Sequence, residues 1–510
     1  MVIALHLPIL SILMGLPIFG SFLLLFLRGT GISQAATARG IALGVSLITF
    51  LLSLVLWIEF DPSMTGLQFE ERANWMPGFG VSYHLGVDGF SLLLLLLTTL
   101  LTPISILAAW RVIHERVSHY MLAVLMLQAA MIGVFVAQDF VVFYISYEAT
   151  LVPGSLLIGL WGGPRRAFAA MKFFLLTFGS SLLMLLVLLY AWYVTGSTDM
   201  DVLLHTRFPM TAQSLIFLAF VLAFGTKLPI WPLHSWLPDA YGEAPAPATA
   251  LLSGVMAKAG AYGLLRFAIG MAPDAARHYA PVMMILGVVG VIYAAIIACA
   301  QTDMKKMVAY SSFSHMGLVV VGLFSLTTEG IDGALFQMVS HGIIIAGLFF
   351  CVSMVSFRAG SRDFAKVTGV VNYAPRLAAL AMAFSMASIG LPGTGGFVGE
   401  VLVIFGALHV NVWLALLAGS SMVLGAIYML SFYWRVMFGK LSGAVAVLHD
   451  MTRLEMAVLV PLVVLTLWMG FYPTSFTRVF NASAHAQVVA VNAHEHALAS
   501  AALPVVLSRN

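Results

Sequence analysis

Apolar runs of about twenty residues recur along almost the whole chain, beginning with LPILSILMGLPIFGSFLLLFL at residues 7–27. A run of about this length crosses the hydrocarbon core of a bilayer as a single helix. Only 9% of the 510 residues are charged, whereas a soluble domain carries about 25%. Because the runs are continuous and do not alternate with polar residues, a membrane β-barrel is excluded. The sequence therefore predicts an all-α polytopic membrane protein.

The number and direction of the spans follow from the apolar runs and the loop charges. We count about fourteen transmembrane helices, centred near residues 17, 50, 99, 128, 150, 181, 225, 258, 289, 317, 344, 390, 423 and 463. Loops after odd-numbered spans hold fifteen of the 24 Lys and Arg, and loops after even-numbered spans hold three. Since cytoplasmic loops are enriched in Lys and Arg, we expect the odd loops in the cytoplasm and both termini outside. The loop after span 7 is an exception, with Asp239 and Glu243 and no base.

Cofactor and targeting motifs are missing from the sequence. The two cysteines, Cys299 and Cys351, are far apart, and no CxxC or Cys/His cluster occurs. This argues against iron–sulfur, zinc and disulfide chemistry, and no phosphate-binding glycine motif indicates a nucleotide site. We expect no metal and no cofactor-binding residue in this chain. The first apolar run is too long for a signal peptide and is predicted to be a retained span. The alanine-rich tail from about residue 474 is predicted to be a short surface helix.

Seven ionisable residues lie inside predicted spans: Glu148, Lys227, His234, Lys258, His315, His341 and Glu400. A charge at the bilayer centre costs about 2.5–3.5 kcal/mol on insertion scales, so each needs a partner or a function. His341 is equally compatible with a packing role. Lys172 and Arg266 lie nearer span ends, where we expect them to snorkel to the interface. Asp139 opens span 5 and is expected to be interfacial.

A pairing of Glu148 with Lys227 would lower the cost of burying both charges and couple their protonation. Lys258, then His315, then Glu400 are the next proton acceptors in this interpretation. Such a row, with water between its members, is what a proton relay requires. A static ion-pair network is the alternative, and the residues alone do not separate the two.

Two spans are interrupted by proline or glycine. Pro229 and Pro232 directly follow Lys227, and residues 385–400, SMASIGLPGTGGFVGE, end at Glu400. A broken helix is tolerated in a membrane where it lines a polar cavity, although the second break is also compatible with simple packing. The interrupted spans are five apart, which predicts two inverted five-helix repeats, each with a broken helix. The predicted units are residues 1–115, helices 1–3; 116–272, helices 4–8; 273–440, helices 9–13; and 441–510, helix 14 and the tail.

Three stretches resemble antiporter-like subunits of proton-pumping NADH:quinone oxidoreductase, respiratory complex I, and of Mrp-type cation/proton antiporters. They are GTKLPIWPLHSWLPDAYGEAPAPATALLSGVMAKAGAYGLLR at 225–266, DMKKMVAYSSFSHMG at 303–317 and GLPGTGGFVGE at 390–400. The resemblance covers about residues 85–440 and implies fourteen helices with inverted repeats. It also implies functional roles for Glu148, Lys227, Lys258 and Glu400. His315 and His341 match family histidines on the central polar axis, and His234 matches one near the first break.

Glu400 and the stretch NWMPGFGVSYHLGVDGFSLLL at 74–94 resemble the M-type members of this family, called subunit 4 in mitochondria. Other branches typically carry lysine at the position of Glu400. The resemblance implies a proton-translocating subunit without a redox centre of its own. Flavin, iron–sulfur clusters and quinone would belong to partner subunits. Expected partners are other complex I membrane subunits on either side and phospholipids, with no nucleic acid, in a bacterial cytoplasmic membrane. A Mrp-type antiporter subunit and a non-conducting scaffold are the alternatives.

Overall fold

The computed structural model describes residues 7–27, 31–440 and 449–506, and side chains as far as residue 492. Within these residues, twelve helices are long and apolar enough to cross a membrane. They are α3 (Ile32–Glu59), α4 (Leu92–Ala109), α5 (Val117–Val136), α6 with α7 (Phe140–Trp161), α8 (Arg166–Thr195), α10 (Met210–Lys227), α12 to η3 (Ala246–Ile269), α14 (Pro273–Ala300), α15 (Met304–Phe324), α16 (Thr328–Ala359), α19 (Val412–Met437) and α20 (Arg453–Phe471). Shorter apolar helices are α2 (Ile9–Leu25), α17 (Pro375–Ile389) and α18 (Gly395–Val410). The prediction of a polytopic helical membrane protein is confirmed.

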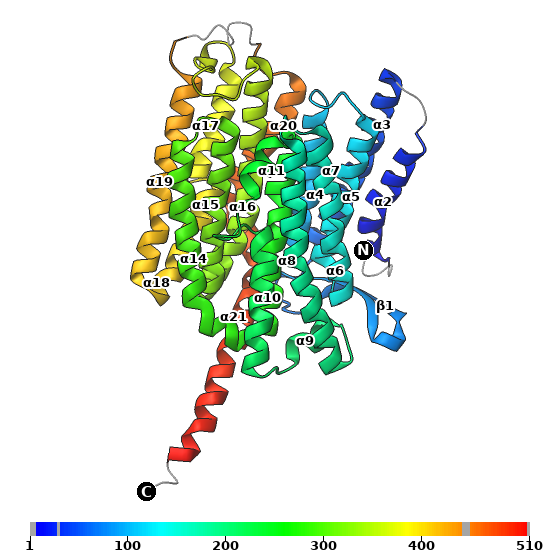
Figure 1. Ribbon diagram of the computed structural model, residues 1–510, viewed down its shortest axis with the longest axis vertical. Coiled ribbons are helices and arrows are strands. Elements are labelled where there is room, and N and C mark those ends of the chain that lie inside the picture. The colour runs from blue at the N-terminus through cyan, green and yellow to red at the C-terminus, as the bar shows by residue number, and fades with distance from the viewer. Residues whose placement is uncertain (1–6, 28–30, 441–448, 507–510) are drawn as a thin grey trace.

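The helices form one upright bundle with two different ends (Figure 1). At one end lie α9 (Met200–His205) and an antiparallel hairpin of β1 (Gln68–Met76) and β2 (Val81–Val87). We call this the hairpin end. The opposite end, which we call the basic end, carries Arg111, Arg165, Arg358 and Arg362. The chain ends that the sequence places outside, residues 1–6 and 507–510, fall beyond the described residues.

Two features of the hairpin end depart from the sequence prediction. The polar stretch after α3 forms the β1–β2 hairpin, so the chain is not entirely α-helical. The tail forms α21 (Thr474–Val506), a 33-residue helix that extends beyond the bundle (Figure 1). The prediction of a short surface helix is therefore wrong. Its first turns are anchored to the bundle, since Phe476 and Phe480 are buried and Asn481 donates to Asp332 Oδ2 of α16 at 2.6 Å.

The interior of the bundle is formed by α4, α5, α15, α16 and the segment from α12 to η3, which is buried along its whole length. Outer helices such as α3, α8, α19 and α20 bury only one face and expose leucine, valine and aromatic side chains on the other. An apolar outer surface is what contact with lipid or with neighbouring membrane subunits requires. The buried polar and charged side chains lie in the interior of the bundle instead.

Asp139 joins three segments at the hairpin end. Its carboxylate accepts from Val141 N at the start of α6, from Ser82 N at 3.0 Å and from Thr198 Oγ1 at 2.8 Å. The residue lies at the end of the span, as predicted, and it is fully buried within the protein. The hydrogen bonds explain this burial, because charge-assisted bonds from buried donors replace water.

Arg266 does not snorkel to the membrane surface as predicted. It is 9% exposed, and its Nη1 lies 2.8 Å from Asp88 Oδ2. Its Nε donates to the Tyr262 hydroxyl at 3.2 Å. Asp88 also accepts from the backbone of Phe90 and Ser91 at the start of α4. The pair links the start of α4 to the end of η3 (Leu264–Ile269).

Lys172 forms an ion pair with an acidic residue near the basic end. Its Nζ lies 2.8 Å from Asp239 Oδ2 of α11 (Leu237–Glu243). Arg165 lies 3.7 Å from Asp239 and 3.9 Å from Glu243. The two acids without a local base, exceptional in the sequence, are therefore paired with bases from the preceding loop and helix.

Removal of Asp88 should destabilise the protein, because it leaves Arg266 buried without a counter-ion. Asp88→Ala is expected to cost about 3–5 kcal/mol, the range for breaking a buried pair. The Asp88→Ala/Arg266→Ala double variant should be less destabilised than the sum of the two single variants. The thermal unfolding midpoint of the protein in detergent measures these effects. Arg207→Ala, an exposed arginine at the same end, is the control. A midpoint for Asp88→Ala equal to that of the control would contradict the assignment.

The hairpin should be more stable at mildly acidic pH. His84 of β2 is buried with Nδ1 3.1 Å from Asp199 and Nε2 3.0 Å from Glu70. Burial lowers the pKa of His84, but the hydrogen bond and charge of Asp199 and the charge of Glu70 outweigh it and raise the pKa above its ordinary value. The raised pKa means that protonated His84 stabilises the folded hairpin. This stabilisation is fully present below about pH 6.5, the pKa of histidine in the unfolded chain, and is lost as pH rises through the pKa of His84 in the folded state.

Amide hydrogen exchange across β1 and β2 measures this effect. Protection is expected to fall as pH increases through the raised pKa, after correction for intrinsic exchange. His84→Gln should remove the dependence, whereas His205→Gln, on exposed α9, should retain it. Equal pH dependence in wild type and His84→Gln would refute the role of His84.

Candidate functional site

Lys227 is the last residue of α10 and is completely buried. Its Nζ donates to Thr150 Oγ1 at 2.7 Å and to the Tyr147 carbonyl at 3.2 Å, and it lies 3.5 Å from the centre of the Tyr147 ring. The C-terminal end of a helix also favours a cation. Four neutral features therefore stabilise the ammonium group: two oxygens, one aromatic face and one helix end.

The predicted break after Lys227 is present. Pro229 ends α10, because proline lacks the amide hydrogen that would continue the helix, and helix resumes at α11. The indole of Trp236 donates to the freed Thr226 carbonyl at 2.7 Å. The broken segment thus satisfies its own backbone while leaving Lys227 at an open helix end.

Glu148 lies next to the residues that hold Lys227 but does not bind it directly. Among the described residues, no ion pair within 4.0 Å joins Glu148 to Lys227. The carboxylate lies beside Ser181 of α8, and its Oε1 is buried without a hydrogen-bond partner. The predicted direct pair is therefore absent in this conformation. The Tyr147 carbonyl and the Thr150 hydroxyl accept two of the three ammonium hydrogens of Lys227 instead.

Lys258 is held by an irregular helix. It lies on α13 (Ala257–Gly263), between the π-helical turns η2 (Leu252–Met256) and η3. Its Nζ donates to the Ser253 carbonyl at 2.7 Å and lies 2.9 Å from His341 Nδ1. Inserted π turns re-aim backbone carbonyls and occur often at functional sites. Lys258 is completely buried and has no carboxylate within ion-pair distance among the described residues.

His341 and His315 continue the array toward Glu400. The two imidazole rings lie 5.3 Å apart between centroids, and His315 Nε2 lies 3.2 Å from Glu400 Oε1. The structure therefore brings Lys258, His341, His315 and Glu400 into one row. His341, which the sequence left as either a packing or a relay residue, lies between Lys258 and His315.

Hydrogen-bond geometry assigns proton positions within this row. His315 Nδ1 lies 2.8 Å from the Ser311 carbonyl and Nε2 lies 3.0 Å from the Ser388 carbonyl. Carbonyl oxygens only accept, so both nitrogens must carry hydrogen and the ring is cationic. Glu400 is then its counter-ion. His341 Nδ1 accepts from the Lys258 ammonium, which leaves the hydrogen of a neutral His341 on Nε2.

The second predicted break lies between α17 and α18. Gly390 and Gly393 have φ angles of 82° and 89°, a left-handed conformation that glycine adopts without steric cost. The break frees the Ser388 carbonyl for His315 and places Glu400 in the second turn of α18. Each break in the bundle therefore supplies both a buried charge and a backbone carbonyl group.

His234 lies away from the row. It stacks on Phe313 at 4.4 Å between ring centroids and meets Tyr293 at 5.2 Å. Its Nδ1 has no hydrogen-bond partner. None of the contacts described for His234 involves another of the seven candidates, so its predicted relay role has no geometric support.

An aromatic cluster covers the side of Lys227 that faces the hairpin end. Phe143 contacts Phe224 and Phe267, and Phe220 contacts Phe140, with ring centroids 4.4–6.0 Å apart. Phe140 and Phe143 precede Glu148 on α6, Phe220 and Phe224 precede Lys227 on α10, and Phe267 lies on η3. The packed rings leave an apolar layer between the two charges and the hairpin end.

Several site groups were not identified from sequence. They are Thr150, Ser253, Ser311 and Ser388. The three serines act through their backbone carbonyls, which no sequence pattern indicates. Thr150 had a signal, since it lies two residues after Glu148.

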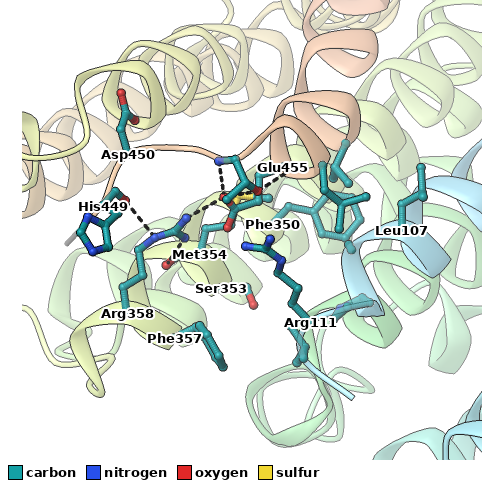
Figure 2. A pocket seen from close by; sticks show the side chains of 16 residues that line it. Leu107, Arg111, Phe350, Ser353, Met354, Phe357, Arg358, His449, Asp450 and Glu455 are labelled. Atoms are coloured by element: carbon teal, nitrogen blue, oxygen red, sulfur yellow. Dashed lines mark hydrogen bonds and ion pairs between the residues drawn. The ribbon is translucent and has the colours of Figure 1, made fainter. Parts of the chain in front are cut away.

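A separate pocket of about 330 Å³ opens at the basic end between α4, α16 and α20 (Figure 2). Arg358 spans it by binding Glu455 at 2.6 Å and the His449 carbonyl at 3.2 Å. Leu107 and Phe350 form part of an apolar wall. None of the seven candidates lines this pocket, so it is not part of the row. Over the described part of the chain, no cluster of three His, Cys, Asp or Glu residues has the arrangement of a metal site.

Comparison with known proteins places the chain in a family. A model of the NADH:quinone oxidoreductase/Mrp antiporter transmembrane family matches residues 137–469. NADH-quinone oxidoreductase subunit M of Rhodobacter capsulatus is 44% identical, over 93% of this chain and 95% of that protein. NADH-ubiquinone oxidoreductase chain 4 of Chondrus crispus is 39% identical, over 90% and 93%.

Solved structures give the same result. A chain of respiratory complex I from Thermus thermophilus superposes with a TM-score of 0.87 at 32% identity, covering 95% of this chain and 99% of that one. A chain of the Mrp complex from Dietzia has a TM-score of 0.83 at 19% identity, with coverage of 95% and 99%, and so shares the fold. The chain therefore belongs to the NADH:quinone oxidoreductase/Mrp antiporter transmembrane family, in the complex I branch of antiporter-like subunits M and 4.

Proposed function

We propose that this chain is a proton-translocating membrane subunit of NADH:quinone oxidoreductase that holds no redox centre itself. Protons move along the buried row, and quinone reduction elsewhere in the complex supplies the energy. The observation that carries this proposal is the row from Lys258 through His341 and His315 to Glu400, in which the two imidazole rings meet at 5.3 Å between centroids without a hydrogen bond. Flavin, iron–sulfur clusters and quinone belong to partner subunits in this proposal.

The hydrogen bonds of the row favour transfer over a static network. His341 accepts from Lys258 at one nitrogen, and its other nitrogen is buried without a partner. Glu400 Oε2 is likewise unpartnered. A static network would satisfy such atoms, because buried polar groups are normally hydrogen-bonded. Open positions beside titratable groups are where water completes a proton path.

Lys227 and Glu148 form the input switch of the proposed path. Lys227 now rests on Thr150 and Tyr147, and Glu148 lies nearby against Ser181. When the Glu148 carboxylate moves toward Lys227, the ammonium group keeps its proton. When the carboxylate moves away, release of that proton toward Lys258 is favoured. The gap between Lys227 and Lys258 has no direct side-chain contact among those described, so water must bridge it.

We infer fourteen spans in which residues 116–272 and 273–440 are inverted repeats, with 1–115 before them and 441–510 after. Isolated bridges support this reading: Asp139 pairs with Asp199, and Asp303 pairs with Asp363, with the partners sixty positions apart each time. Asp139 and Asp303 each cap the helix that follows, α6 and α15. The first pair lies at the hairpin end and the second at the basic end, as inversion requires.

The proposed location is a bacterial cytoplasmic membrane, with the basic end in the cytoplasm and both termini on the periplasmic side. The concentration of Lys and Arg at one end supports this orientation. Homologous membrane subunits of complex I and phospholipids are the proposed partners of the apolar outer face.

A Mrp-type cation/proton antiporter subunit is the second candidate, and it is less supported. The Mrp chain is 19% identical and the complex I chain is 32% identical. Glu400 also stands where Mrp members typically have lysine. A non-conducting scaffold is disfavoured, because it gains nothing from charges that are costly to bury.

Lys227→Ala should abolish the share of proton pumping that this subunit contributes, because it removes the acceptor between Glu148 and Lys258. Protons pumped per NADH oxidised, in membrane vesicles, is the measured quantity. Electron transfer from NADH to an artificial acceptor reports the amount of assembled complex and should be largely retained. Glu148→Ala should behave similarly, whereas Glu148→Asp should be milder because it retains the charge.

Lys440→Ala, an exposed lysine at the basic end, is the matched control. Normal pumping in Lys227→Ala would remove this residue from the mechanism. Identical behaviour of Glu148→Asp and Glu148→Ala would refute the argument from charge.

His341→Leu should interrupt the row, while His234→Leu should have a much smaller effect, because only His341 contacts Lys258. A proton-transfer group contributes about 10²–10⁴-fold in rate, so the subunit's share of pumping should disappear in His341→Leu. The same vesicle assay compares the two variants. Equal pumping losses in both would contradict the geometric distinction.

A further inference from the structure

The pocket at the basic end holds two arginines in different environments. Arg358 is neutralised, since its Nη2 lies 2.6 Å from Glu455 Oε2 and its Nη1 donates to the Met354 carbonyl at 3.0 Å. Arg111 follows closely after Ala109, the last residue of α4. Figure 2 shows its guanidinium group directed into the pocket, with dashed lines at Arg358 and none at Arg111. In the described part of the chain, no hydrogen bond or ion pair joins this guanidinium group to another residue.

The acidic residues of the pocket are already paired. Asp450 accepts from the Arg376 backbone amide at 3.3 Å, and its carboxylate lies 3.9 Å from Arg376 Nε. Glu455 pairs with Arg358 and also belongs to the capping box at the start of α20. One positive charge, that of Arg111, is therefore left over at the pocket. A ligand group with a single negative charge complements it.

Apolar side chains form much of the remaining wall. Leu107 comes from α4, Phe350 and Met354 come from α16, and Val458 comes from α20. Phe357 also lines the pocket and is 63% exposed, so an apolar side chain lies where the pocket opens to the outside. The pocket thus combines one uncompensated cation with an apolar surface.

A phospholipid uses both features of the pocket, whereas a free anion uses only one. An arginine guanidinium group binds phosphate through two parallel hydrogen bonds, and basic pockets between transmembrane helices on the cytoplasmic side bind anionic lipid headgroups. Arg111 lies just beyond the end of a membrane-spanning helix, which is the depth of the headgroups. A free phosphate would leave the apolar wall in contact with water, which is unfavourable, whereas an acyl chain covers that wall.

We propose that the pocket binds one anionic phospholipid, whose phosphate lies on Arg111 and whose acyl chain covers the apolar wall formed by α4, α16 and α20. The volume of about 330 Å³ falls within the range of small-ligand sites, about 300–1,000 Å³. The site gives a position to the phospholipids proposed as partners. It does not depend on the proton row, since none of the seven candidate residues lines the pocket.

A photocrosslinking residue at the opening of the pocket identifies the bound molecule. The assembled complex carrying Phe357→p-benzoylphenylalanine is irradiated in its native membrane, and this subunit is analysed by mass spectrometry. The enrichment is the ratio of anionic to zwitterionic phospholipid adducts, divided by the same ratio in the membrane extract. It should fall about tenfold in Arg111→Gln, because a charge-assisted hydrogen bond is lost. Arg111→Lys should retain part of it, because the charge remains but the planar fork does not.

Two controls match this variant. Arg453→Gln removes a positive charge at the start of α20, beside the pocket but outside its lining, and should leave the enrichment unchanged. The crosslinker placed at Phe471, which is 67% exposed at the other end of α20, should show no enrichment with or without Arg111. No enrichment at Phe357 in the presence of Arg111, or equal enrichment in Arg111→Gln, would overturn the proposal.

Other occupants of the pocket give different results. Inorganic phosphate added before irradiation should not change the adducts, and loss of the lipid adduct would assign the pocket to a free anion and contradict the lipid site. A protein adduct at Phe357 would show that a neighbouring subunit covers the pocket, with the same consequence. Electron transfer from NADH to an artificial acceptor reports assembly of each variant complex. Since the adducts are measured independently of pumping, failure of the lipid site and failure of the proposed function are distinguishable.

Discussion

The burial of lysine ammonium groups within an apolar bundle is the constraint on which the rest of the structure depends. Lys227 and Lys258 are completely buried, and among the described residues neither has a carboxylate within ion-pair distance. Each is held by neutral oxygens that regular helices would not offer. The Tyr147 carbonyl and Thr150, where α6 meets α7, receive Lys227, and the Ser253 carbonyl within a π turn receives Lys258. The irregular backbone is therefore the means by which the membrane interior tolerates these charges.

Neutral hydrogen-bond partners also leave the buried lysines able to gain or lose a proton. A tight ion pair would hold a proton firmly, because separating buried opposite charges is costly. Lys227 and Glu148 are neighbours without direct contact, and His341 and Glu400 each retain one polar atom without a partner. Among the described residues, the one ion pair of the row, His315 with Glu400, lies at its far end. The arrangement therefore combines a stable interior with groups that can exchange protons with little rearrangement.

The sequence predicted the apolar helices, the two breaks and the seven buried ionisable residues, because apolar length, proline and a buried charge are local properties. It failed where a contact joins distant segments. Asp88 and Arg266 are far apart in sequence, and nothing local to Arg266 indicates that a carboxylate from the start of α4 reaches it. The hairpin was missed because β1 is largely polar and β2 is too short an apolar run to be read as a span. The direct Glu148–Lys227 pair was wrong because side-chain direction depends on how α6 and α10 pack, and Thr150 competes for the ammonium. His341 gained its central position only from the fold of α16 against α13.

The continuity of the path between its two halves is the central claim. A density map of the complex in lipid, at a resolution that shows ordered water, tests it most directly. We predict ordered water between Lys227 and Lys258, where no direct side-chain contact is described, and beside Glu400 Oε2. An apolar gap without water between the two lysines would contradict the account, because protons would then have no route from the first half of the chain to the second.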